Sequence, residues 1–278
     1  MISEDYKLIW SDEFLGQFGE KPSDEHWKFD VGGNGWGNRE LQYYTDSRLN
    51  SFITGDGKLV LRARRLTQPG YKCWYGPCHY TSARLSTKNN FSFQYGLLET
   101  KVKFPKGTGV WGAIWLLGNA SDQTSWPENG EIDIVEYLWR SPNSIFCGLH
   151  GPDYSHLENN HILQEYCNDS IFFSDSYNKF AVRWNENGVS WFLNGKNYFS
   201  ILNTDIINNK KRWVFNKPFH IIINLAIGGR WPGYPETENS DSDIWQKDMT
   251  IDYVRVYKET TVFEEVVNYS YGENNHEI

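Results

Sequence analysis

The stretch 131–136, EIDIVE, places three carboxylates among apolar residues that favour β-strands. Strict alternation along a strand would put Glu131 and Asp133 on one face and bury Glu136 on the other. Because a buried, unpaired glutamate is costly, the pattern favours a different register. One extra residue, a β-bulge near 134–135, returns Glu136 to the face of the other two acids. The stretch therefore predicts three acids along one open sheet face, in preference to a solvated strand face without a function.

Short strand-like runs separated by turn residues recur along the whole chain, and no stretch shows convincing helical periodicity. Asn194-Gly195 joins two of these runs with a dipeptide typical of tight hairpins. Twelve strands at this spacing predict an all-β fold of two antiparallel sheets, as a sandwich or a barrel, with the β-jelly roll as the leading form. The predicted strands lie at 7–10, 57–65, 81–87, 96–104, 112–118, 131–139, 144–150, 179–184, 189–195, 196–201, 219–227 and 250–258.

The 278 residues contain no Ser/Pro/Gly-rich linker and no repeat, so we expect one domain over residues 1–258. Residues 259–278 have no obvious strand partner and end polar, which predicts an edge addition or a tail.

The net charge of −8, without any basic run, argues against nucleic acid and against an anionic membrane as partners. No apolar run approaches the length of a membrane span, and the N-terminal ten residues lack the features of a signal peptide. We therefore expect a monomer that acts on a neutral partner or a small solute.

Four cysteines leave two alternatives open. Cys73 and Cys78 bracket a WYGP turn, and Cys147 and Cys167 lie twenty residues apart. Two disulfides would fit a secreted or extracellular protein, which is the location that we expect, whereas four free thiols would fit a cytosolic protein. No CxxC pair suggests zinc.

The aromatic content of 17%, with 13 tryptophans, is unusually high. Most of these rings are expected in the core. Several, however, lie beside Gly, Asn and Pro in loop-like segments at 32–38, 125–130 and 228–233. Rings on such loops can stack against the C–H faces of a sugar.

Paired carboxylates on one face are the groups that break a glycosidic bond, since one attacks the anomeric carbon and the other protonates the departing oxygen. A third acid can keep the pKa values of the pair apart. A calcium or magnesium site is the competing interpretation. It is disfavoured because the DxDxDG spacing is missing and three side chains on one strand surround an ion poorly.

The chain also resembles glycoside hydrolase family 16, specifically its laminarinase-like endo-β-1,3-glucanases, whose fold is a β-jelly roll with a concave sheet as the substrate cleft. The ExDxxE signature of that family, in its bulged form, matches the register inferred above. The matching segments are WSDEF (10–14), GGNGWGNRELQYYT (32–45), DGKLVL (56–61), YTSARLST (80–87), YGLLETKVKFPKGTGVWGAIWLLG (95–118), WPENGEIDIVE (126–136), NLAIGGRWPG (224–233) and DYVRVY (252–257).

The resemblance implies retaining hydrolysis of β-1,3-glucosidic bonds in a β-glucan without a catalytic cofactor. It makes Glu131 the nucleophile, Glu136 the acid/base and Asp133 the assisting acid. For His150, which would face the acid/base, a hydrogen-bonded core histidine is an equal alternative. The implied substrate contacts are Trp115, Trp126, Asn38, Arg84 and Trp231.

The resemblance also implies a structural Ca²⁺ where the first and last strands meet. Its ligands would be Glu13, the carbonyl of Gly57 and Asp252. The alternative is that the two acids cap turns.

Two departures from the family pattern concern specificity and strand path. The segment 111–115, WGAIW, lacks a proline that the family usually has, and Arg230 stands where asparagine is frequent. Two other functions are weighed against the β-1,3-glucanase: a mixed-linkage β-1,3-1,4-glucanase, and a non-catalytic glucan-binding protein, which the presence of all three acids disfavours.

Overall fold

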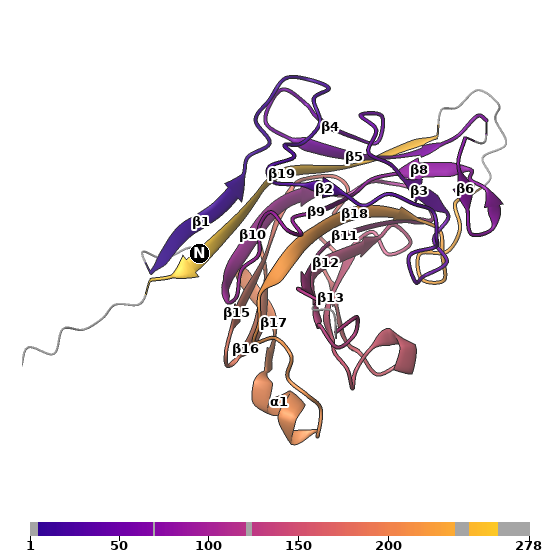
Figure 1. The fold of residues 1–278 in the computed structure, drawn as a ribbon. Coiled ribbons are helices and arrows are strands. Elements are labelled where there is room, and N and C mark those ends of the chain that lie inside the picture. Colours follow the sequence, from indigo (N-terminus) through magenta and orange to yellow (C-terminus); the bar gives the residue numbers. More distant parts are fainter. Residues whose placement is uncertain (1–4, 69, 121–123, 237–244, 261–278) are drawn as a thin grey trace, which may run out of the picture.

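The computed structural model describes residues 5–68, 70–120, 124–236 and 245–260. Within these residues the regular secondary structure is almost entirely strand, with one short α-helix and one 3-10 turn (Figure 1). The elements are β1 (Tyr6–Asp12), β2 (Lys28–Phe29), β3 (Gln42–Tyr44), β4 (Ser51–Ile53), β5 (Leu59–Arg65), β6 (Lys72–Cys73), β7 (Gly76–Pro77), β8 (Tyr80–Ser82), β9 (Arg84–Ser86), β10 (Gly96–Lys103), β11 (Val110–Gly118), β12 (Glu131–Leu138), β13 (Ser144–His150), η1 (His156–Glu158), β14 (Ile162–Cys167), β15 (Asn178–Asn185), β16 (Gly188–Leu193), β17 (Lys196–Leu202), α1 (Asn203–Asn208), β18 (Phe219–Ile227) and β19 (Gln246–Glu259).

Two curved sheets stack on each other and share one core. The ten-stranded sheet has the order β17-β16-β15-β10-β19-β5-β8-β3, with β1 added beside β19 and β4 beside β5. The seven-stranded sheet has the order β14-β13-β12-β11-β18-β9-β2, and β6 and β7 form a separate hairpin. The predicted all-β jelly-roll sandwich is confirmed. One pair, β3 with β8, is parallel.

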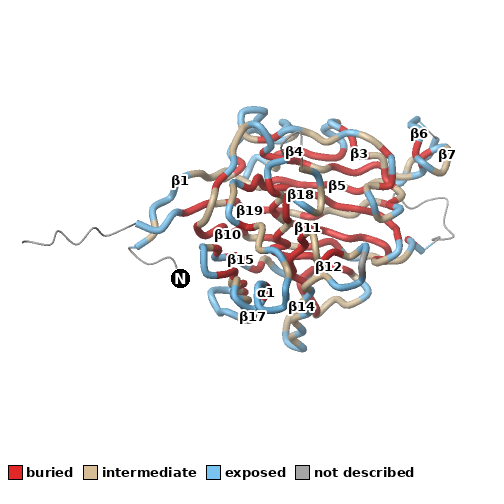
Figure 2. The backbone as a smooth tube through the Cα atoms, turned by 60° about the horizontal axis from the view of Figure 1, so that its bottom comes forward, coloured by how far each residue is buried: buried red, intermediate tan, exposed pale blue. Residues whose placement is uncertain are grey.

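The core lies between the sheets, and Figure 2 shows buried residues running through the central strands β18, β11 and β12. On β11 and β12 alternate residues enter it, among them Ile114, Leu116, Ile132 and Tyr137. Burying each such side chain contributes roughly 1.5–3 kcal/mol, so the pattern firmly sets which strand face turns outward. We call the side of the seven-stranded sheet that points away from the core its outer face.

The prediction of one strand at 81–87 was wrong in one respect. The segment is two strands, β8 and β9, that belong to different sheets and meet at Ala83. Ala83 is fully buried, and the Ser82 hydroxyl donates to the carbonyl of Leu225 at 2.6 Å. The small residue lets the chain cross from one layer to the other.

Turn chemistry in the hairpin of β16 and β17 agrees with the sequence. Asn194 and Gly195 both have positive φ, 50° and 81°, as a two-residue hairpin turn of type I′ requires. The helix α1 and six strands were not predicted, namely β2, β3, β4, β6, β7 and β14. Side chains of β14 are alternately exposed and half-buried, which gives a weak sequence signal.

Of the two possible disulfides, only one forms. Cys73 and Cys78 are bonded and close the β6–β7 hairpin, whereas Cys147 and Cys167 are free. The second pair lies on neighbouring strands, but Cys147 pairs in register with Gln164, three positions from Cys167. Cys147 is buried and Cys167 exposed, so the two thiols do not meet.

Residues 261–278 lie outside the described residues, so the predicted tail stays a prediction. The last described strand, β19, ends at Glu259, one residue beyond the predicted domain boundary. Among the described helices, none is long and apolar enough to cross a bilayer.

Candidate active site

The bulge inferred from the stretch 131–136 is present in β12. Ile114 pairs with Val135 and Trp115 with Asp133, so Ile134 is the extra residue opposite β11. Opposite β13 the register shifts over the same residues. Ile134 and Val135 both enter the core, which turns the three acids of β12 to the outer face.

Glu131 and Asp133 lie beside an imidazole from the neighbouring strand β13. The Nε2 atom of His150 is 3.3 Å from Asp133 Oδ2 and 3.7 Å from Glu131 Oε1. Trp126 donates its indole N–H to Glu131 Oε2 at 2.8 Å. Among the described residues, this trio of two acids and His150 also has the spacing of a metal site, with its ligand atoms within 4.8 Å of one another.

Glu136 lies in a more apolar setting on the same face. Trp111 donates its indole N–H to Glu136 Oε1 at 3.2 Å. Phe146 is opposite Glu136 in register on β13, and Leu138 packs with Trp111 and Phe146 in a small cluster. Glu136 is therefore buried, with 8% of its surface exposed, although it faces outward.

Burial raises the pKa values of both glutamates, but their neighbours differ. Burial, followed by the charge of Asp133, raises the pKa of Glu131 to about 8. The same causes raise the pKa of Glu136 well above its ordinary value. The charge of His150 and an indole N–H favour the ionised form of both glutamates, with Trp126 donating to Glu131 and Trp111 to Glu136. His150, however, lies within ion-pair distance of Glu131, at 3.7 Å. We therefore expect Glu131 to be the glutamate that loses its proton first.

His150 carries the compensating charge. Burial lowers the pKa of its imidazole, but the carboxylates of Glu131, Asp133 and Glu136 together raise it to about 9. At neutral pH the cluster therefore combines one imidazolium with acids that cannot all be ionised. His150 is buried, and its imidazole lies against Asp133 and Glu131, so its role toward the substrate stays a prediction.

Arg84 and Trp115 lie beside the acids on the outer face. Trp115, on β11, is opposite Asp133 in register. The guanidinium carbon of Arg84 lies 4.8 Å from the ring centres of both Trp36 and Trp115, and Arg84 Nε donates to Asp30 at 2.8 Å. Flat aromatic and planar cationic groups thus form a continuous surface next to the carboxylates.

Several known proteins are similar to this chain over most of its length. A beta-glucanase from Rhodothermus marinus is 36% identical over 261 residues, which cover 91% of this chain and 85% of the relative. A glucan endo-1,3-beta-glucosidase from Cryptopygus antarcticus is 35% identical, covering 89% of this chain and 90% of the relative. The laminarinase catalytic domain of Thermotoga maritima superimposes with a TM-score of 0.82 at 37% identity, covering 92% of this chain and 99% of that domain.

The sequence profile of "Glycosyl hydrolases family 16" matches residues 35–255. The chain belongs to this family. It is a glycoside hydrolase, and its chemistry needs no catalytic cofactor.

Two other predicted contacts of this family 16 chain lie in loops at the margin of the outer face. Trp231 packs edge-on against Trp111, with ring centres 5.2 Å apart, and against Phe146 at 5.0 Å. It therefore lies at the Glu136 end of the site. Asn38 is half-buried, and its carbonyl accepts from the backbone N–H of Arg230 at 3.3 Å, which joins the loops 32–41 and 228–233.

The missing proline in the 111–115 segment does not disturb β11. The strand is continuous and pairs along its whole length with β18. Gly112 faces the core, where a Cβ would come within 2.9 Å of the Phe104 ring and 3.0 Å of the Met249 sulfur. The small residue at this position is required by core packing.

Sequence reasoning placed Trp36 on a loop that could stack against a sugar but missed three side chains near the acids: Trp111, His156 and His161. Alternation could have identified Trp111, since it shares a strand face with Trp115. The other two histidines lie around His150, with His161 stacked on it at 4.9 Å and His156 at 5.5 Å. They come from the segment between β13 and β14, and no sequence signal places them there.

The residues predicted to hold calcium have other partners in this structure. The Glu13 carboxylate accepts two hydrogen bonds from Arg255, at 2.8 and 2.7 Å, and Asp252 pairs with Lys101 at 2.6 Å. Both acids are therefore held by basic side chains. The Glu13 carbonyl oxygen does approach Gly57, lying 3.5 Å from the position that a Cβ there would take.

Proposed function

We propose that this family 16 hydrolase cleaves internal β-1,3-glucosidic bonds of laminarin-type β-glucans with retention of anomeric configuration. The observation that carries the proposal is the unequal pair of glutamates on one bulged strand, Glu131 beside an imidazolium and Glu136 beside indole and phenyl rings. The names of the similar proteins, a beta-glucanase, a glucan endo-1,3-beta-glucosidase and a laminarinase, support the substrate class.

In the first step, Glu131 attacks the anomeric carbon while Glu136 gives its proton to the departing glycosidic oxygen. The C–O bond to the leaving sugar breaks as the bond to the Glu131 oxygen forms. In the second step, the ionised Glu136 takes a proton from water, whose oxygen displaces Glu131 from the anomeric carbon. Two inversions give net retention.

Asp133 and His150 set the protonation of this pair. The charge of Asp133 favours the protonated form of both glutamates, and the imidazolium favours the ionised form of both. The imidazolium lies within ion-pair distance of Glu131 Oε1, at 3.7 Å, which favours Glu131 as the ionised member of the pair. Glu131 is thereby suited to attack and Glu136 to donate, which is the division of roles that the first step requires.

The aromatic surface beside the acids is proposed to bind the glucan. Trp115 and Trp126 offer rings to sugar C–H faces, and Arg84 and Asn38 offer polar groups to hydroxyls. Trp231 would form the wall at the Glu136 end.

Azide rescue tests the two roles separately, because azide can replace a missing carboxylate. With an activated aryl β-glucan oligosaccharide, Glu131→Ala should yield the α-glycosyl azide, since azide attacks in place of Glu131. Glu136→Ala should yield the β-glycosyl azide, because Glu131 still forms the glycosyl-enzyme that azide then opens. The opposite anomers would exchange the two roles, and no rescue in either variant would remove the assignment.

Product release on different glucans tests the substrate. Wild-type protein should release reducing ends from laminarin, and in the first seconds NMR should show the β-anomer. Binding to laminarin without release of reducing ends would make the protein a glucan-binding protein. Faster cleavage of barley mixed-linkage glucan than of laminarin would make it a β-1,3-1,4-glucanase.

A structural Ca²⁺ is proposed with a reduced ligand set. Two hydrogen bonds from Arg255 occupy both oxygens of the Glu13 carboxylate, whereas Lys101 contacts one oxygen of Asp252 and leaves the other as a donor. That oxygen and the backbone oxygens of Glu13 and Gly57 are hard donors that suit Ca²⁺. The charge of Asp252 also acts on Lys58, the residue after Gly57. Melting with millimolar CaCl₂ should raise Tm over melting in EDTA, and Asp252→Asn should abolish the difference.

Secretion is the proposed location. The Cys73–Cys78 disulfide supports it, because such bonds persist in oxidising compartments. Immunoblotting of the culture medium and of the cell pellet tests it.

A further inference from the structure

The motif GGNGWGNRELQYYT contributes Asn38 to the proposed site, but three other side chains of this motif have no role there. Glu40, Gln42 and Tyr44 alternate, so they share one side of the chain at β3. All three are buried, with 4%, 0% and 0% of their surfaces exposed. Glu40 therefore does not touch substrate, yet burying a carboxylate is costly.

The buried carboxylate ends a chain of hydrogen bonds that begins on the outer face. Trp115 donates its indole N–H to Asn224 Oδ1 at 2.8 Å. Asn224 Nδ2 donates to the Tyr44 hydroxyl at 3.2 Å, and that hydroxyl donates to Glu40 Oε2 at 3.3 Å. Gln42 Nε2 also donates to Glu40 Oε2, at 2.5 Å.

The chemistry of the two ends gives this chain one direction. An indole N–H can only donate and an ionised carboxylate can only accept, so the amide and the hydroxyl between them have a single consistent orientation. With the acceptor removed, the Tyr44 hydroxyl and the Asn224 amide lose the group that orients them. The Trp115 indole then loses its fixed partner.

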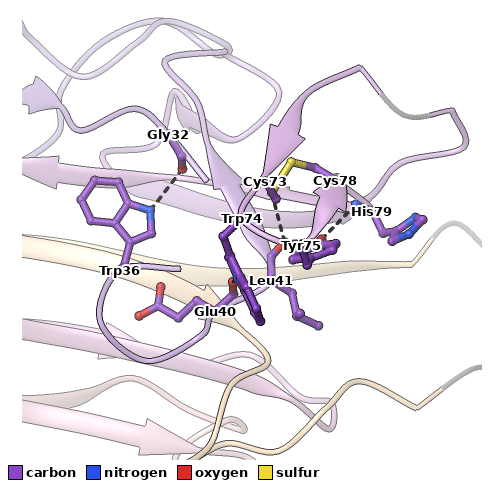
Figure 3. The surroundings of a disulfide bond; sticks show 9 residues. All are labelled: Gly32, Trp36, Glu40, Leu41, Cys73, Trp74, Tyr75, Cys78 and His79. Carbon is purple, nitrogen blue, oxygen red and sulfur yellow. Dashed lines mark hydrogen bonds between the residues drawn. A yellow bond between two sulfur atoms is a disulfide. The ribbon is translucent and has the colours of Figure 1, made fainter. Parts of the chain in front are cut away.

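Two contacts hold Glu40 at the end of this chain. The side-chain oxygen Oε1 of Gln42 accepts from the backbone N–H of Ile227 at 2.7 Å, which ties the motif to the end of β18. From the opposite side, Trp74 in the disulfide hairpin donates to the Glu40 carbonyl at 2.8 Å (Figure 3).

The same hairpin also fixes the residue after Glu40. Tyr75 donates its hydroxyl to the Leu41 carbonyl at 2.7 Å, as Figure 3 shows. The closed β6–β7 hairpin therefore restrains the backbone of this loop where the buried carboxylate begins.

Burial disfavours the ionised form of Glu40, and the groups around the carboxylate offset part of this effect. Burial raises the pKa of Glu40 to about 7, while its hydrogen bond from Gln42, the charge of Arg84 and contacts with Asn38 and Tyr44 act in the opposite sense. Arg84 is the cation stacked beside Trp115. The buried acid thus acts on two groups of the proposed sugar-binding surface, by hydrogen bonds on one and by charge on the other.

We propose that Glu40 is a positioning residue that, through Tyr44 and Asn224, fixes the Trp115 indole and with it the orientation of the sugar bound against this ring. The inference rests on the proposed function for the identity of the ligand. Glu40 affects substrate binding, because it lies behind the aromatic surface. The acids of β12 carry out the proton transfers.

The test removes the Tyr44 hydroxyl and compares the effect on glucan binding with that of removing a matched hydroxyl elsewhere in the protein. Tyr44→Phe cuts the chain, and Tyr253→Phe is the control, because the buried Tyr253 hydroxyl also donates to a carboxylate, Glu99, at 2.7 Å, in the ten-stranded sheet. Both variants are placed in the Glu131→Ser background, and the Kd of a linear β-1,3-linked glucose hexasaccharide is measured by calorimetry. KM and kcat are measured with Glu131 intact.

We expect Tyr44→Phe to raise Kd and KM about tenfold and to change kcat less than threefold, as a loss of uniform binding does. Tyr253→Phe should leave Kd, KM and kcat within twofold of the wild type. Glu40→Leu should weaken binding as Tyr44→Phe does, and the double variant should be no weaker than the weaker single variant, because both changes break one chain.

Equal Kd values for Tyr44→Phe and Tyr253→Phe, at equal losses of Tm, would overturn the positioning role and leave a structural one. Additive losses in the double variant would also overturn it. If the wild type releases no product from laminarin, the proposed function fails, whereas the comparison of Kd values still decides the role of Glu40.

Discussion

The acids described here on the two sheets differ in their charged partners. On the ten-stranded sheet and its rim, Glu13 is held by Arg255 and Asp248 by Arg62, each through two hydrogen bonds of 2.7–2.8 Å. On the outer face of the seven-stranded sheet, three acids of β12 lie together. Among the described residues, the basic group within ion-pair distance of these three acids is a histidine, not a lysine or arginine.

This difference shows what distinguishes a reactive carboxylate from a structural one. A permanent guanidinium partner stabilises the ionised form and keeps an acid inert. Burial beside other acids instead raises its pKa toward the range where protons are exchanged, and a nearby imidazolium offsets only part of that rise. The seven-stranded sheet keeps this unfavourable arrangement because its strands are fixed by the core that lies behind them.

The largest expected effect comes from removing the nucleophile. Glu131→Ser should lower kcat on laminarin by about 10⁴–10⁶-fold, as the loss of a nucleophile typically does. The Tm should not fall, because the residue faces away from the core and its pKa is raised by burial. Initial rates measure kcat and thermal melts measure Tm. An activity within tenfold of the wild type would contradict the assignment of Glu131 as a reactive carboxylate.

Removing the imidazolium should change both rate and pH dependence. His150→Asn deletes the positive charge that lowers the pKa of Glu131, so that pKa should rise further above its value of about 8. The acidic limb of kcat/KM should then move to higher pH, with a loss of about 10–100-fold at neutral pH. A profile with an unmoved acidic limb would show that His150 only packs against the acids.

The stability effect of neutralising Glu136 should depend on pH. Burial raises the pKa of Glu136 in the folded protein, so its stabilising contribution is fully present below its unfolded pKa, near 4.5, and is lost as pH rises through the folded value. Glu136→Gln stays neutral and avoids this loss. Its Tm should equal that of the wild type at pH 4 and exceed it at pH 8, measured by calorimetry; a lower Tm at pH 8 would reverse the assigned shift.

The smallest effect is expected on the ten-stranded sheet. Glu13→Gln breaks a pair with Arg255 whose side chains are both about one-third exposed, so the loss should be about 0.5–1 kcal/mol in the free energy of unfolding. Urea denaturation at pH 7 measures it. Activity on laminarin should stay within twofold of the wild type. A larger loss would show that this acid of the ten-stranded sheet also affects catalysis.

The sequence by itself determined the local features. Alternating apolar residues predicted the main strands, and the two consecutive apolar residues at 134–135 predicted the bulge, because a different register would have buried an unpaired acid. Asn194-Gly195 predicted its hairpin turn. These features depend on neighbours within a few positions, so short patterns record them.

Only the tertiary structure decided which distant residues surround the acids. The indole of Trp111 on Glu136, the stacking of His161 on His150, and the buried chain from Glu40 to Trp115 all join separate segments. The crossing at Ala83 likewise depends on which sheet each half of its segment enters. The order of strands in the two sheets brings these groups together, and that order is set by burial of the shared core, which no short pattern encodes.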